Sequence, residues 1–111
     1  MARTELTVQT ISRAGLEAAY TSAIADGHKF VNDGMMLVTV KNGAVDKTIT
    51  VQTAATVDGK AVGDDSVTVT ANEERDIGPF PPSIYNQADG MVYIDYSSPT
   101  NVTIAAKRLG L

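Results

Sequence analysis

The chain contains a single histidine, His28, which is the first residue to consider as a catalytic base or a metal ligand. Both roles need partners, because a zinc site takes several His or Cys ligands and a general base must be oriented by a neighbouring group. There is no cysteine and no second histidine, and Asp26 and Asp33 fall in expected turns. We therefore expect His28 to be a surface or half-buried residue beside a turn.

Carboxylates are the other candidates for chemistry. Asp58, Asp64 and Asp65 lie in one glycine-containing loop, and calcium prefers oxygen ligands from such loops. The EF-hand spacing and its terminal glutamate are missing, so a solvated acidic loop is the alternative. Glu73 and Glu74 are adjacent in a turn, where neighbouring side chains point apart. With no phosphate-binding loop or nucleophile elbow present, we expect no catalytic site, no metal and no cofactor.

Two short motifs have a structural and a functional interpretation. The run Pro79-Phe80-Pro81-Pro82 has the PxxP spacing of peptides that dock on aromatic grooves. It lacks a flanking basic residue, and such runs also act as rigid turns, here with Phe80 in the core. Asn101-Val102-Thr103 matches the glycosylation sequon, but no secretion signal accompanies it.

Charge and hydropathy exclude some partners. The 111 residues carry nine Lys plus Arg against thirteen Asp plus Glu, a net charge of −4. Binding to a nucleic-acid backbone needs a basic footprint, so no direct nucleic-acid partner is expected. No apolar run is long enough to cross a bilayer, so no membrane partner is expected. The N-terminus has no apolar signal core, which predicts synthesis in the cytoplasm of the host cell.

Alternating apolar residues predict β-strands through most of the chain. The stretch from Met35 to Thr53 reads as a hairpin of two strands joined by a turn at Asn42-Gly43. Side chains two apart share a face of a strand, so each strand offers one apolar face to a core. The residues expected on that core face are Met36, Val38 and Val40 of the first strand and Ile49, Val51 and Thr53 of the second.

The remaining pattern predicts the fold class. About eight short strands are separated by turn signals, which favours an all-β antiparallel sandwich, jelly-roll-like or immunoglobulin-like, as a single domain over residues 1–111. A small barrel is the alternative. The segment 13–27 has helical spacing but no good N-cap, so a short helix and an ordered loop both remain open. Residues 54–65 are expected to cross from one sheet to the other.

The first twelve residues form a candidate N-terminal arm. Leu6 and Val8 alternate with polar residues, which predicts a short strand with one apolar face. This strand has two interpretations. It pairs with an exposed strand edge on a neighbouring protein, or it is an ordinary first strand of the same sandwich.

Three further residues are candidates for contact with a partner. Tyr93 falls on the face of its strand opposite Val92 and Ile94, and Met35 and Leu37 fall opposite the expected core. Tyrosine is enriched at protein interfaces, where its ring and its hydroxyl both contribute. These faces are either covered within the sandwich or available to a partner.

Three segments carry a family resemblance: FVNDGMMLVTVKNG, VTVTANEERDIGPFPPSIYNQADG and VYIDYSSPTNVTIAAKRL, spanning roughly residues 30–109. Their order of strand and turn residues resembles that of small auxiliary capsid proteins of tailed bacteriophages, also called decoration or cement proteins. The resemblance implies a small, β-rich, non-enzymatic protein that binds the outer surface of an assembled capsid and stabilises it. It transfers no individual residues, and residues 1–27 lie outside it.

The resemblance further implies a virion protein on the capsid exterior, with the major capsid protein as partner. A small surface per copy favours a homo-oligomer, with a trimer as the expected state, because repeated contacts raise one another's effective concentration. Two alternative functions remain open: a head–tail connector or tail-associated virion protein, and a carbohydrate-binding β-sandwich module. Exposed aromatic side chains would serve the second.

Overall fold

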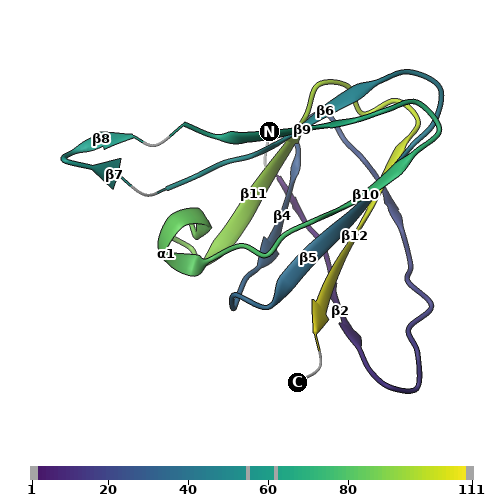
Figure 1. The fold of residues 1–111 in the computed structure, drawn as a ribbon, viewed down its shortest axis with the longest axis horizontal. Helices are drawn as coiled ribbons and strands as arrows, with labels where there is room; N and C mark the ends of the chain where they lie inside the picture. The colour runs from purple at the N-terminus through teal and green to yellow at the C-terminus, as the bar shows by residue number, and fades with distance from the viewer. Residues whose placement is uncertain (1–2, 55, 62, 110–111) are drawn as a thin grey trace.

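The computed structural model describes residues 3–54, 56–61 and 63–109, whose strands form two five-stranded sheets packed face to face (Figure 1). This confirms the predicted β-sandwich. What we call the first sheet has the strand order β1 (Thr4–Glu5), β4 (His28–Val31), β11 (Met91–Tyr96), β6 (Lys47–Val51) and β9 (Asp65–Val69).

The second sheet has the order β10 (Glu74–Ile77), β5 (Met36–Asn42), β12 (Val102–Leu109) and β2 (Val8–Ile11), and the short β3 (Thr21–Ser22) also pairs with β12. Two smaller elements lie outside the sheets: the hairpin of β7 (Thr56–Val57) with β8 (Lys60–Ala61), and the one-turn helix α1 (Pro82–Tyr85). In Figure 1 the β7–β8 hairpin projects away from the sandwich.

The core lies between the sheets and is built by the predicted alternation. The central strands β4, β5, β6, β11 and β12 contribute alternate side chains to it, because successive side chains of a strand point to opposite faces. Five of the predicted core residues, Met36, Val38, Val40, Ile49 and Val51, are buried, and Phe80 is buried as expected. Thr53 lies beyond the end of β6 and is only half-buried, which corrects its prediction. The other large contributions come from Phe30, Val69, Val92, Ile94, Val102 and Ile104, each at most 1% exposed.

The predicted central hairpin is wrong. β5 and β6 lie in different sheets, and residues 43–46 carry the chain from the second sheet to the first. Gly43 makes this crossing against Asn101, donating its N–H to the Asn101 carbonyl over 2.9 Å. A Cβ on Gly43 would lie 2.8 Å from the Asn101 Cβ, so this close approach favours glycine. Both strands still turn their apolar faces to one core, which is all that the alternation requires.

The connection over residues 54–65 also differs from its prediction. It leaves β6, forms the β7–β8 hairpin and returns to the same sheet, where β9 pairs antiparallel with β6. The crossing to the second sheet occurs instead at residues 70–73, between β9 and β10. Loop composition indicates a turn, but strand pairing is decided by packing, and this explains the error.

The N-terminal strands make the sheets mixed, where wholly antiparallel sheets were expected. β1 pairs in parallel with β4, and β2 pairs in parallel with β12, so residues 4–11 pass from the edge of one sheet to the edge of the other. Residues 12–20 form no helix and run as a loop into β3. The N-terminal residues thus pair with strands of their own sandwich, which is the second of the two interpretations given for this segment.

Candidate functional site

An apolar strip crosses the outer face of the second sheet at one end of the sandwich. Met35 and Leu37 point outward because Met36 and Val38 are buried on the other face. Leu109 donates its backbone N–H to the Met35 carbonyl over 3.1 Å, which brings the two residues side by side. The strip consists of Ile11, Met35, Leu37, Pro79 and Leu109.

The strip is hollowed into a shallow groove. A cavity of about 320 Å³ is lined by Met35, Leu37, Pro79 and Leu109, with Asp76 at its rim. Leu109 is 41% exposed, so this apolar surface is open to solvent and not closed over by the described chain. Grooves of this kind accept apolar side chains from a partner, because burying them removes apolar area from water.

Another part of the same face is covered by the chain's own loop over residues 12–20. The Lys41 ammonium lies 4.1 Å from the centre of the Tyr20 ring, and Lys107 lies 5.7 Å from it on the neighbouring strand. The Gln9 side chain both donates to the carbonyl and accepts from the N–H of Ala19, each over 2.8 Å. The loop 12–20 is thus fastened over part of this face, while the apolar strip lies outside the part that the loop covers.

Tyr93 lies on the outer face of the opposite sheet and is engaged within the chain. The Arg3 guanidinium lies 4.8 Å from the centre of its ring, and its hydroxyl donates to the Asp89 carboxylate over 2.8 Å. Arg3 also forms an ion pair with Asp95 over 2.6 Å, and Gln52 donates to the same carboxylate. This hydrogen-bonded cluster is polar, which makes it less suited than the strip to bury an apolar partner.

The structure therefore separates the five candidate contact residues into three places. Met35 and Leu37 come together in the strip, while Tyr93 lies on the other sheet. Leu6 is 4% exposed and packs in the core, and the half-buried Val8 packs against that core, so neither side chain lies in the apolar strip. Sequence reasoning missed Ile11, Pro79 and Leu109. Of these three, only Leu109 could have been inferred from the sequence. It falls on the face of its strand opposite Ile104 and Ala106, which are buried.

His28 is buried, which corrects its expected place at or near the surface. It is 0% exposed, its Nδ1 lies 2.7 Å from the Tyr96 hydroxyl, and its Nε2 has no hydrogen-bond partner among the described residues. A proton on Nδ1 leaves only a lone pair unsatisfied at Nε2, which costs less than a buried unpaired N–H. We infer this neutral tautomer, and burial lowers the pKa of His28 because it disfavours the charged ring.

We expect this histidine to make the fold sensitive to mild acid. Its folded pKa lies below the unfolded value of 6.5, so the unfolded chain takes up the proton first as the pH falls. Stability is then fully present above that value and declines below it, by at most about 1.4 kcal/mol per pH unit for one proton. Urea midpoints measured between pH 7.5 and 5 check this, with His28→Gln as the comparison. An equal slope in the variant would contradict it.

Three of the five candidate carboxylates bond to other groups of the chain. Asp64 accepts the backbone N–H of Thr53 over 3.0 Å, Asp65 accepts the Tyr85 hydroxyl, and Glu73 pairs with Arg75 over 3.0 Å. Within the ranges that the structure describes, no group of three or more His, Cys, Asp or Glu side chains is placed to hold a metal ion. These contacts fit the interpretation of loop and turn carboxylates better than that of a calcium site.

Comparisons with known proteins complete the description of the surface. A scan against models of protein families, a search of curated proteins and a search of solved structures each find no match to this chain. Among the described residues, no helix is long and apolar enough to cross a membrane.

Proposed function

We propose that this protein is a structural virion protein that binds the outer surface of an assembled phage capsid and stabilises it. The observation that carries the proposal is the solvent-exposed apolar strip, which contains Met35 and Leu37 and lies outside the part of the face that the chain's own loop covers. An exposed apolar groove with a polar surround is typical of a protein-binding surface. The resemblance to decoration proteins supplies the identity of the partner, the major capsid protein.

Stabilisation follows from mass action. A protein that binds the intact shell and not the dissociated subunits lowers the free energy of the shell, without any catalytic step. The protein acts in this proposal as a non-enzymatic component of the capsid exterior.

The strip is small for this task, which favours repetition. A stable protein–protein interface buries on the order of 1,600 Å² in total, and five side chains supply only part of that area. Copies arranged around a symmetry axis raise the effective concentration of one another's contacts. We therefore propose a symmetric homo-oligomer on the shell, with a trimer as the expected state.

Of the two alternative functions, the carbohydrate-binding module is the one on which the positions of the tyrosines bear. A carbohydrate-stacking surface needs exposed rings on one face, whereas the four tyrosines are dispersed. Tyr20 lies under lysines on the second sheet, Tyr93 under Arg3 on the first, and Tyr85 and Tyr96 pack against the core. A connector or tail-associated role would use the same strip, and it is distinguished by where the protein binds.

Co-sedimentation with assembled capsids tests the proposal. The unaltered protein should pellet with capsids, and Leu37→Asp should weaken this binding about tenfold or more, because it places a charge in an apolar contact. Val45→Asp is the matched control, since Val45 is 61% exposed and lies outside the strip. Circular dichroism verifies that both variants are folded.

Two outcomes would contradict the proposal. One is an unaltered protein that does not bind capsids but forms rings seated at a portal or tail, which favours the connector. The other is capsids that release their genome at the same temperature with and without the bound protein, which excludes a cementing role.

A further inference from the structure

The edge of β4 is only half covered by its neighbour β1. Pairing runs from Thr4 opposite His28 to Glu5 opposite Lys29, and Leu6 then donates its N–H to the Lys29 carbonyl over 2.7 Å. Beyond this bond the N-terminal chain leaves the first sheet for β2 in the second. The last residue of β4, Val31, is therefore left at an open strand edge.

The backbone of Val31 faces this open edge. Residues facing each other in an antiparallel pair alternate between hydrogen-bonded and non-hydrogen-bonded positions. Asn32 donates its N–H to the Gly90 carbonyl over 3.4 Å, so the adjacent pair of Val31 with Met91 is the non-hydrogen-bonded one. The N–H and C=O of Val31 consequently point away from β11, and neither bonds to another segment in the described part of the chain.

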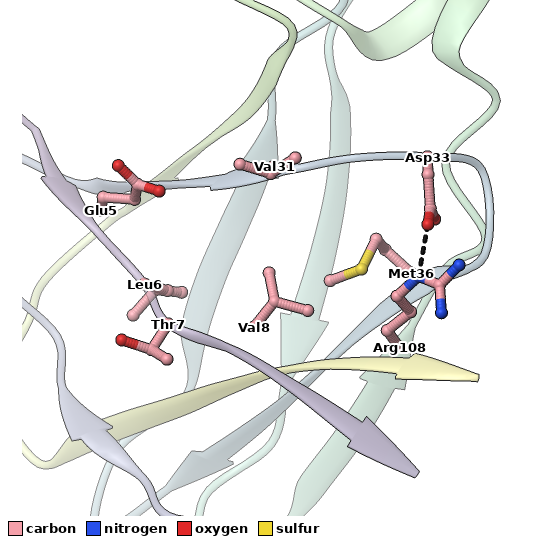
Figure 2. A pocket seen from close by; sticks show the side chains of 8 residues that line it. All are labelled: Glu5, Leu6, Thr7, Val8, Val31, Asp33, Met36 and Arg108. Atoms are coloured by element: carbon pink, nitrogen blue, oxygen red, sulfur yellow. Dashed lines mark hydrogen bonds and ion pairs between the residues drawn. The ribbon is translucent and has the colours of Figure 1, made fainter. Parts of the chain in front are cut away.

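A cavity lies directly beside this edge. Figure 2 shows the N-terminal segment diverging from the Val31 strand, with Val8 and Met36 in the wedge between them. The cavity has a volume of about 580 Å³, and its apolar lining consists of Leu6, Val8, Val31 and Met36. Val31 is 50% exposed, and the same residue both lines the cavity and carries the free backbone groups.

The charged side chains that line the cavity indicate which kind of peptide segment would bind there. Glu5 and Asp33 line the cavity with Arg108, whose guanidinium bonds to Asp33. Two carboxylates and one guanidinium leave one net negative charge at the opening. Lys29 stands opposite Glu5 in the ladder, but its ammonium reaches Asp89 over 3.9 Å.

We propose that this edge binds an extended peptide segment of a partner protein, which adds to the first sheet beside Val31. Its backbone pairs with the free N–H and C=O of Val31, as in other cases of strand addition. One aliphatic side chain of the segment enters the cavity toward Val8 and Met36, and a basic residue lies near Glu5. This site is separate from the apolar strip, and the proposal holds whether or not the partner is a capsid protein.

Peptide titration followed by NMR of the ¹⁵N-labelled full chain tests the site. The probe is acetyl-Lys-Thr-Val-Thr-Lys-amide, compared with the same peptide N-methylated at its three central residues. The unmodified peptide should give saturable shifts at residues 5–8 and 31–33. The methylated peptide should bind at least tenfold more weakly, because it has lost the backbone donors and kept the side chains.

A second comparison tests the charge at the rim. Glu5→Gln should weaken binding of the basic peptide by about two- to fivefold, as expected for one exposed ion pair. Glu5 is exposed and forms no ion pair within the described residues, so this substitution leaves the fold intact. Absence of saturable shifts, equal binding of the methylated peptide, or shifts centred on the apolar strip would each overturn the proposal. None of these results bears on capsid co-sedimentation, so the two proposals fail separately.

Discussion

Replacing Phe30 with alanine should lower the free energy of unfolding by about 3–5 kcal/mol, the usual cost of emptying a buried aromatic site. Phe30 is 0% exposed on β4, and its ring centre lies 5.6 Å from that of Phe80. Phe80 in turn stacks edge-on against Tyr85 at 5.5 Å. The three rings fasten the segment 79–85 to the core, so the loss of Phe30 removes both apolar burial and aromatic contacts.

Urea denaturation measures this effect, and it has a local counterpart. Pro79 lines the groove of the apolar strip and precedes Phe80, so the variant should also show faster amide exchange at residues 80 and 83–87. Val45→Ala is the control, because exposed positions usually change stability by less than about 0.5 kcal/mol. A loss below about 1 kcal/mol for Phe30→Ala would show that the three-ring cluster does not anchor the segment.

Replacing Gly27 with alanine should cost about 2–4 kcal/mol, through backbone strain and overpacking together. Gly27 has a φ of +81°, and an added Cβ would lie 2.6 Å from the Ile94 carbonyl oxygen and 2.4 Å from an Arg3 nitrogen. The carbonyl belongs to the sheet backbone and cannot move freely. Arg3 would have to give up its position beside Asp95, which loosens the attachment of the N-terminal strand.

Gly15 provides a matched control for Gly27. Its φ of +93° demands the same left-handed backbone, but no atom lies within 4 Å of an added Cβ. Gly15→Ala should therefore cost only the strain, about 1 kcal/mol. Thermal or urea unfolding of the two variants separates the contributions. Equal losses would mean that the close packing of Gly27 beneath Arg3 and Asp95 contributes nothing.

The alternation of apolar residues was sufficient to predict the longer strands and most of the core, but not the two-residue strands β3, β7 and β8. Val38, Val40, Ile49 and Val51 are buried as expected, because a two-residue period places every second side chain on one face whatever the strand pairs with. The outward direction of Met35 and Leu37 followed from the same period. The strand character of a segment and the face to which each of its side chains points are thus local properties. Both can be inferred from residues two positions apart in the sequence.

Pairing is a long-range property and was decided by the tertiary structure. β5 and β6 satisfy their alternation equally well as a hairpin or in opposite sheets, and only packing against β12 and β11 selects the second arrangement. The positions of the candidate sites also depend on which strands pair. The apolar strip joins Ile11, Met35 and Leu109 across three strands far apart in sequence.

His28 shows the same limit for a single residue. Its type and its position beside Gly27 indicated a turn-flanking side chain, yet pairing with both β1 and β11 places it in the interior. Sequence by itself determined that this chain is built mainly of β-strands, with an apolar face on β5 opposite its core face, because those features need only local periodicity. That the strands form two packed sheets and not a barrel was decided by their pairing. The strip, the open edge at Val31 and the burial of His28 arose from which strands meet, because the free energy of pairing depends on contacts between segments that the local pattern leaves equivalent.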